Sequence, residues 1–263
     1  MPELPEVEAF GKYFDKTSLN KKIKNVEVKN PEILQNIDVK DLKKKLEGQK
    51  FQFTKRYGKN LFAHLDNDFW LILHFGMTGK LKYFQKKDEA PSYDRVLINF
   101  ENNETLAFVD PRKFGKVNLT DNMDNFIKEK KLGHDSLEVD LKTFKELLEK
   151  RNGAVKTVLM NQQIIAGVGN IYSDEILFQT CVHPKTSVNK LNKDQIETIF
   201  NVMKSVLKTA IDRNIEHQNL PDSFIIPHRV KNGRCPNSDK KLKTIKISGR
   251  TSYYCPECQK ELF

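Results

Sequence analysis

The pattern of apolar and polar positions changes along the chain and divides it into regions of different structure. Val7, Phe10 and Phe14 recur at helical spacing, and Pro5 just ahead of them suits the first turn of a helix. From residue 23 to about residue 119 apolar and polar positions alternate with period two, which is typical of strands with one buried face. We therefore expect a short helix followed by an antiparallel β-sandwich or flattened barrel.

Turn signals separate the predicted strands of this region. Asp66, Asn67 and Asp68 stand between apolar residues 61–65 and 69–73, and Asn102 and Asn103 stand between residues 96–100 and 106–108. Clusters of Asp and Asn favour tight turns because their side chains hydrogen-bond to the nearby backbone. The spacing predicts adjacent antiparallel strands joined by hairpins.

After about residue 130 the apolar period returns to 3.6, which indicates helices. Asp140 can cap a helix over residues 141–148, and a longer helix is predicted over residues 196–211. Residues 219–222, Asn-Leu-Pro-Asp, break this pattern, and a β-like alternation appears at residues 244–247. The whole chain is therefore expected to be an α+β protein of more than one domain.

Charge suggests a polyanionic partner without identifying the chemistry. The 263 residues contain 45 Lys or Arg and 35 Asp or Glu, a net charge of +10, and the last 36 residues hold nine Lys or Arg against three Asp or Glu. A basic tail of this density suits phosphate contacts, although basic residues also serve simply to keep a surface soluble.

Sequence features argue against a membrane or secreted location. The longest apolar run, residues 69–75, is far shorter than the roughly 20 residues that span a bilayer, and residues 1–10 lack a secretory pattern. Three of the four cysteines, Cys235, Cys255 and Cys258, lie close together near the end, as metal ligands do. We expect a cytoplasmic protein, in which the separate Cys181 is a small buried apolar residue.

The amino terminus permits an unusual nucleophile. If Met1 is removed, Pro2 presents a secondary amine, and an α-amino group with a pKa of about 8 is a better-poised nucleophile than lysine. Glu3 and Glu6 supply carboxylates for proton transfer. Taken alone, Pro and Glu are also ordinary residues at a helix start.

Six ordered segments resemble the formamidopyrimidine-DNA glycosylases, bacterial base-excision repair enzymes, over essentially the whole chain. They are MPELPEVE at 1–8, KRYGKNLF at 55–62, HFGMTG at 74–79, DPRKFG at 110–115, AGVGNIYSDE at 166–175 and GRTSYYCPECQ at 249–259. The resemblance implies a β-sandwich domain with a terminal helix over residues 1–130, a helix-two-turn-helix domain over 131–220 and a zinc-finger-like β-hairpin over 221–263. It also implies a monomer that acts on the bacterial nucleoid.

The resemblance implies a bifunctional glycosylase and AP lyase that excises oxidised purines such as 8-oxoguanine and formamidopyrimidines. In such enzymes the proline amine forms a Schiff base at C1′, and β- and δ-elimination then cut the strand. The matching catalytic residues here are Pro2, Glu3, Lys59 and Arg250. No cofactor is consumed.

The same resemblance implies a set of contacts with damaged double-stranded DNA. Met77, Arg112 and Phe114 match residues that enter the duplex where a base is flipped out, although large apolar residues are more commonly core. The glycines at 167 and 169 are expected to leave backbone amides facing a phosphate. The further predicted DNA contacts are His74, Tyr93, Arg151, Lys156 and Asn170.

The predicted metal site departs from the family pattern Cys-x2-Cys-x16-Cys-x2-Cys. Ser238 stands where the second cysteine is expected, beside Cys235, Cys255 and Cys258. A serine hydroxyl is a poor zinc ligand, so Asp239 or a water is expected to complete a structural zinc site. Complete loss of the metal is the alternative.

Two other functions are compatible with parts of the sequence. An endonuclease VIII-like glycosylase for oxidised pyrimidines is the closer rival, but that branch usually carries glycine in place of Leu4. Residues 214–234 are shorter than in many relatives, which makes preference for 8-oxoguanine less secure than preference for damaged purines in general. A damaged-DNA-binding protein without catalysis is disfavoured by Pro2, Glu3 and Lys59.

Overall fold

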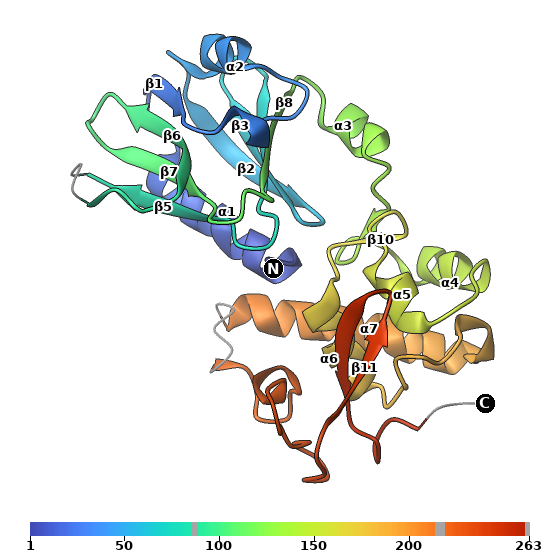
Figure 1. The fold of residues 1–263 in the computed structure, drawn as a ribbon. Helices are drawn as coiled ribbons and strands as arrows, with labels where there is room; N and C mark the ends of the chain where they lie inside the picture. The colour runs from blue at the N-terminus through green and yellow to red at the C-terminus, as the bar shows by residue number, and fades with distance from the viewer. Residues whose placement is uncertain (86–88, 214–218, 261–263) are drawn as a thin grey trace. The chain divides into compact units, whose positions relative to one another are not determined.

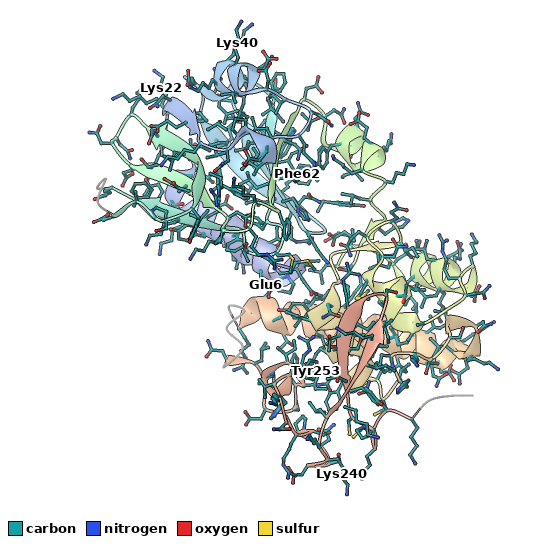
Figure 2. The ribbon with its side chains drawn as sticks, in the orientation of Figure 1. Glu6, Lys22, Lys40, Phe62, Lys240 and Tyr253 are labelled. Atoms are coloured by element: carbon teal, nitrogen blue, oxygen red, sulfur yellow. The ribbon has the colours of Figure 1, made fainter. Side chains whose placement is uncertain are left out.

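The computed structural model describes residues 1–85, 89–213 and 219–260. The chain forms two compact units, one of residues 1–2 and 6–130 and the other of residues 3–5 and 131 onward. Figure 1 shows most of the strands in the first unit and most of the helices in the second. Figure 2 shows the side chains of both units, with Phe62 labelled in the first unit and Tyr253 in the second.

The first unit is a sandwich of two four-stranded antiparallel sheets, as the alternating pattern predicted. One sheet has the order β2-β3-β4-β8 and the other β1-β6-β7-β5. The strands of the first sheet are β2 (Phe51–Tyr57), β3 (Asn60–Leu65), β4 (Trp70–His74) and β8 (Lys116–Thr120). Those of the second are β1 (Ile23–Val28), β5 (Lys80–Phe84), β6 (Asp94–Phe100) and β7 (Thr105–Val109).

Helices complete the apolar packing of the first unit. The predicted amino-terminal helix is α1 (Leu4–Ser18), and Val7 and Phe14 on its apolar face are fully buried in the sandwich core. The remaining helical elements of this unit are η1 (Pro31–Ile33), α2 (Val39–Leu46) and α3 (Met123–Glu129). Phe126 of α3 covers Phe62 and Ile72 on the outer face of the first sheet, so this sheet is buried on both sides.

A β-bulge interrupts the period-two pattern at the start of β2. Phe51 pairs with Leu65 and Phe53 pairs with His64. Strand β2 therefore moves forward by two residues over a stretch in which β3 moves by only one, and this extra residue is the bulge. Phe51 is therefore in the core, whereas Phe53 is 39% exposed and stacks on His64. Simple alternation would have placed both phenylalanines on one face.

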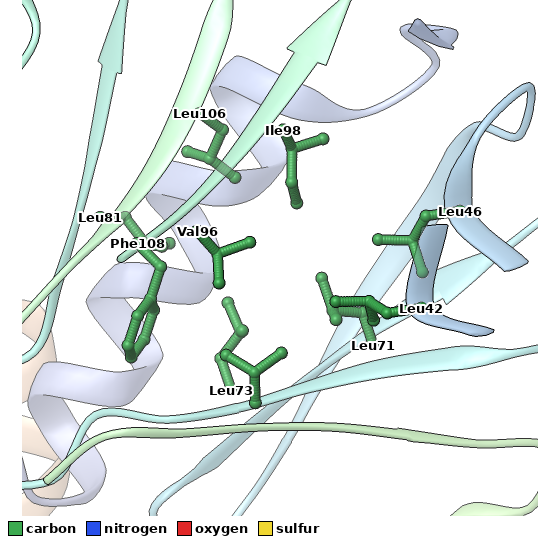
Figure 3. A pocket seen from close by; sticks show the side chains of 10 residues that line it. Leu42, Leu46, Leu71, Leu73, Leu81, Val96, Ile98, Leu106 and Phe108 are labelled. Atoms are coloured by element: carbon green, nitrogen blue, oxygen red, sulfur yellow. The ribbon is translucent and has the colours of Figure 1, made fainter. Parts of the chain in front are cut away.

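A small apolar void remains between the sheets. Figure 3 shows its lining side chains, among them Leu71 and Leu73 of β4 and Leu42 and Leu46 of α2, converging from both layers and the helix. Its volume is about 10 Å³, and no polar group lines it, so a water molecule would find no hydrogen-bond partner there.

Truncating a side chain at this void tests the sandwich core. Leu71 is 1% exposed, and we expect Leu71→Ala to lower the free energy of unfolding by about 3 kcal/mol because the void grows. Trp70, the only tryptophan, reports unfolding of this unit by its fluorescence during urea titration. Half-buried Leu119, the cross-strand partner of Leu71, is the control, and equal losses for the two alanine variants would contradict the prediction.

The second unit is mainly helical, as the 3.6-residue period predicted. The side chain of Asp140 caps helix α4 (Leu141–Glu149) by accepting the Thr143 amide at 2.8 Å. Asn192 and Gln195 form a capping box at the start of α7 (Lys193–Asp212). The other elements are α5 (Val155–Met160), α6 (Asn170–Gln179), η3 (Val188–Lys190), η5 (Ile226–His228) and the parallel two-residue strands β9 (His134–Asp135) and β10 (Ile165–Ala166).

A β-hairpin ends the second unit. Strands β11 (Lys243–Ile247) and β12 (Arg250–Tyr254) pair antiparallel, and Ser248 and Gly249 between them both have positive φ. Two positive φ values are typical of a type I′ turn, which glycine favours and which fits the twist of a hairpin. Within the described ranges, no helix is both long and apolar enough to cross a membrane.

Candidate functional site

The carboxylate of Glu3 caps the amino terminus of helix α6. Its Oε2 accepts the amide protons of Gly169 at 2.6 Å and Tyr172 at 3.3 Å, and its Oε1 accepts that of Ile171 at 2.8 Å. The side chain is fully buried, and the positive end of the helix dipole favours a negative group there. The residue next to Pro2 is therefore fixed by three backbone donors.

This contact corrects the expectation that the Gly167 and Gly169 amides face a phosphate, because Gly169 donates to Glu3 and Gly167 donates to Gln162 Oε1 at 3.0 Å. The helix start does bind an anion, but the anion is a carboxylate of the same chain. Gly167 has φ +119°, and a Cβ there would lie 2.7 Å from a side-chain atom of Leu4. The glycine is thus required for close approach of the amino-terminal residues.

A buried ionic network lies next to this cap. Asp174 of α6 is essentially buried and accepts hydrogen bonds from the Lys156 ammonium, from Arg229 Nη2 at 2.9 Å and from the Tyr253 amide at 3.0 Å. Lys156 Nζ also donates to Asn170 Oδ1 at 2.8 Å. The Asn170 amide group donates in turn to the carbonyl of Thr251 at 3.1 Å.

Lys156 and Asn170, both predicted to contact DNA, are hydrogen-bonded within the protein by this network. Lys156 is fully buried, and burial lowers the pKa of its ammonium while Asp174 opposes this shift. Together Asn170 and Asp174 attach strand β12 to α6. Phosphate contacts of Lys156 and Asn170 stay predictions. Asp174 and Arg229 were not predicted to take part in the site, although Asp174 lies in the matched segment 166–175.

Two other predicted basic residues of this unit are on its surface. Arg250 begins β12 directly after the two-residue turn, and its side chain is exposed. Arg151 is exposed directly after α4. Both positions are accessible to a polyanion.

In the first unit, Lys59 and His74 lie at one end of the β2-β3-β4-β8 sheet. Lys59 occupies the turn between β2 and β3 and is 8% exposed, and His74 ends β4 opposite Asn60. His74 Nδ1 accepts the Gly76 amide at 3.3 Å, so the ring carries its proton on Nε2. Burial, reinforced by Lys59, Lys116 and Lys130, lowers the pKa of His74 to about 4. A neutral imidazole that carries its proton on Nε2 suits a phosphate oxygen.

The depressed pKa of His74 makes stability depend on pH. In the unfolded chain the pKa of His74 is about 6.5, whereas in the folded chain it is about 4. The contribution of His74 to the free energy of unfolding is therefore fully present above pH 6.5 and is lost as the pH falls toward 4. Between pH 7.5 and 5 we expect His74 to account for a loss of about 2 kcal/mol. Urea unfolding of the protein and of His74→Gln at both pH values measures it. An equal pH dependence in the two proteins would rule this out.

Two loops at the same end present the predicted duplex-inserting residues to solvent. Met77 is 42% exposed and Phe114 49%, so neither belongs to the core. The Arg112 guanidinium carbon lies 4.8 Å from the centre of the Phe114 ring. The backbones of the loops touch, since a Cβ on Gly76 would lie 2.4 Å from the carbonyl carbon of Phe114.

The buried carboxylate of Asp110 joins these loops. Its Oδ1 accepts the Thr78 hydroxyl at 2.5 Å and the Arg112 amide at 3.2 Å, and its Oδ2 accepts the Gly115 amide at 2.6 Å. Asp110 lies in the matched segment 110–115, but the sequence alone gave it no role.

Tyr93, the remaining predicted DNA contact, is 57% exposed and has a φ of +64°.

The sulfur atoms of Cys235, Cys255 and Cys258 lie within 4.8 Å of one another. The Sγ atoms of Cys235 and Cys258 are 3.7 Å apart, and Ser238 Oγ is 3.4 Å from Cys255 Sγ. A tetrahedral zinc with bonds of about 2.3 Å requires its sulfurs about 3.8 Å apart, so the three thiols are close enough to hold zinc, and the Ser238 hydroxyl lies beside them.

Two expectations about this region are wrong. Asp239 does not join the cluster, because its side chain is 81% exposed and pairs with Arg234 at 2.9 Å, and φ of +55° directs the residue outward. Cys181 is exposed rather than buried, because α6 ends at Gln179 and Cys181 lies in the following turn with φ +55°.

Restoring the missing thiol tests the metal site. We expect Ser238→Cys to hold zinc at least about tenfold more tightly than the natural protein, because a thiolate replaces a neutral hydroxyl. Competition with a zinc-binding dye, combined with elemental analysis, measures the affinity. Asp239→Ala is the control and should leave the affinity unchanged. Weaker zinc binding in Asp239→Ala would return Asp239 to the ligand set.

Comparison with protein families covers most of the chain. The model of the formamidopyrimidine-DNA glycosylase N-terminal domain matches residues 1–117, and that of the formamidopyrimidine-DNA glycosylase H2TH domain matches residues 132–220. The formamidopyrimidine-DNA glycosylase of Bacillus subtilis is 33% identical over 98% of this chain and 99% of the relative. That of Mycoplasma mobile is 31% identical over 98% of this chain and 99% of the relative.

Solved structures give the same result. The wild-type Lactococcus lactis Fpg (MutM), in complex with DNA containing N7-benzyl-Fapy-dG, is 29% identical and superimposes with a TM-score of 0.89. The same protein bound non-covalently to DNA with an AP site has a TM-score of 0.89 and is also 29% identical. Each comparison covers 99% of this chain and 100% of the relative.

Proposed function

This chain belongs to the formamidopyrimidine-DNA glycosylase family, and from that premise we propose that it is a bifunctional DNA glycosylase and AP lyase for oxidised purines. The observation that carries the proposal is the capped position of Glu3, because three amides of α6 fix the residue that directly follows the proposed nucleophile. The full-length similarity to enzymes of this name supports the choice of reaction.

The proposed reaction begins after removal of Met1. The nitrogen of Pro2 forms a bond to C1′ of the damaged nucleotide, the glycosidic bond breaks, and the protonated base leaves. The Pro2 nitrogen then loses its proton, and the C1′–O4′ bond of the sugar ring opens to give an iminium between Pro2 and C1′. The iminium acidifies the C2′ proton; loss of this proton expels the 3′ phosphate, and a second elimination, with loss of the C4′ proton, expels the 5′ phosphate. We assign the proton transfers to Glu3, Lys59 and Arg250, with Lys59 also positioned for phosphate contact by its turn.

The proposed substrate is duplex DNA with 8-oxoguanine or a formamidopyrimidine. Met77 and Phe114 would fill the space of the flipped nucleotide, Arg112 would donate hydrogen bonds to the base left opposite it, and the exposure of all three side chains supports this. His74, Tyr93, Arg151, Lys156 and Asn170 would contact phosphates. A zinc ion, when bound by Cys235, Cys255 and Cys258, would stabilise the hairpin that carries Arg250.

Substrate preference within the family rests on fewer observations. Oxidised pyrimidines remain the competing substrates, and Leu4, fully buried in the core of the second unit, distinguishes this chain from that branch by sequence. Part of the short segment 214–234 lies outside the described residues. We therefore propose damaged purines as the substrate class without ranking them.

Borohydride trapping tests the nucleophile. On duplexes with 8-oxoguanine, formamidopyrimidine or oxidised thymine, we expect a covalent adduct with the purine lesions. Pro2→Gly should lower strand cleavage by about 100-fold or more, because the secondary amine is lost, while damaged-DNA binding stays measurable.

Different outcomes separate the alternatives. An adduct only with oxidised thymine would favour the pyrimidine branch, and no adduct with any duplex would favour a binding protein. Lys128→Met, outside the proposed site, serves as the control that should trap normally. Full cleavage by Pro2→Gly, or by a preparation that retains Met1, would refute Pro2 as the nucleophile.

A further inference from the structure

Arg95 of β6 is a half-buried arginine outside the residues proposed above to contact DNA. Its Nε donates to the carbonyl of Asp110 at 2.7 Å, and its Nη2 donates to the carbonyl of Pro111 at 3.3 Å. These are the two carbonyls immediately before Arg112. One guanidinium therefore holds the backbone from which Arg112 projects, and its planar fork suits two neighbouring acceptors.

A second set of contacts continues from the same guanidinium. Arg95 Nη1 donates to Asn30 Oδ1 at 2.8 Å, and Asn30 Nδ2 donates to Glu32 Oε1 at 3.1 Å. The same Glu32 oxygen pairs with Lys113 Nζ at 2.7 Å. The loop is thus attached on both sides of Arg112, at residues 110–111 and at Lys113.

The loop needs such attachment because its backbone is unfavourable. Lys113 has φ +57°, in the left-handed region that residues with a Cβ rarely adopt. The exposed Phe114 and Arg112 side chains have no core packing to hold them. Polar contacts to the backbone therefore set the direction of both side chains.

We propose that Arg95 is a positioning residue that fixes Arg112 and Phe114 for insertion into the duplex and so determines how well the protein distinguishes the base opposite the lesion. This inference rests on the proposed function of Arg112 and Phe114. The distinction between opposite bases then depends on Arg95, a residue of strand β6, which acts through the carbonyls of Asp110 and Pro111. Arg95 also lies 5.5 Å from the Tyr93 ring and so supports a third proposed DNA contact.

The test measures insertion without requiring catalysis. A duplex with a stable abasic-site analogue carries 2-aminopurine opposite the analogue, and its fluorescence reports the stacking of inserted side chains. With Arg95→Met we expect the fluorescence change on saturating binding to fall to a small fraction of that of the natural protein. Arg95→Lys, which keeps the charge but can hold only one carbonyl well, should give an intermediate change.

Catalytic measurements then separate positioning from general damage. We expect Arg95→Met to lower single-turnover excision from duplexes by about tenfold or more and to bring the rates with the four opposite bases closer together. Borohydride trapping on a single-stranded abasic site, which needs no insertion, should change by less than about twofold. In the Arg112→Ala background, Arg95→Met should not alter the opposite-base preference further.

Controls make each result decisive. Lys22→Met removes another cation and its ion pair with Glu101 at the edge of the same sheet, and it should behave like the natural protein. An unchanged fluorescence signal and opposite-base preference in Arg95→Met would overturn the inference, as would an equal loss of single-stranded trapping. If the natural protein inserts but never forms an adduct, the proposed enzymatic function fails while the fluorescence comparison still decides the role of Arg95.

Discussion

The burial of one carboxylate at the start of α6 constrains the rest of the second unit. Glu3 meets Gly169, a residue 166 positions later, so the second unit is complete only when the start of the chain is in place. Burying a charge is costly, and here three amide donors and the helix dipole offset that cost. An apolar replacement would leave these amides unsatisfied at about 1–3 kcal/mol each. The position beside Pro2 is thereby specified by folding itself.

Most of the fold follows from local rules that the sequence displays. The alternation in residues 51–108 and the Asp140 cap predicted strands and helices that the structure contains, because burial of one face and capping are local effects. The bulge at Phe51 and Phe53 escaped prediction because it depends on the register with β3, a partner that the pattern of one strand does not identify. Likewise, the exposure of Cys181 depends on where α6 ends.

The candidate site was predicted less completely, for a physical reason. The family resemblance singled out the loop residues Met77 and Phe114, which are exposed in the structure, whereas Asp110 and Asp174 act through contacts that only the folded chain creates. Sequence also suggested Asp239 as a ligand because it adjoins Ser238, yet adjacent residues point in different directions. Being adjacent in sequence is therefore a weak guide to which residue binds a metal. Asp110 and Asp174 lie in the matched segments 110–115 and 166–175, but those segments do not show what the two carboxylates contact.

The backbone contact between Gly76 and Phe114 has a consequence for how this surface can evolve. The two loops approach so closely in their main-chain atoms that any residue larger than glycine at position 76 would force them apart. The side chains at 77 and 114 can therefore vary in size and polarity while the gap between their attachment points stays constant. Under the proposed function, a substitution at position 77 or 114 would change which lesion the surface accepts while the distance between the two loops stays fixed.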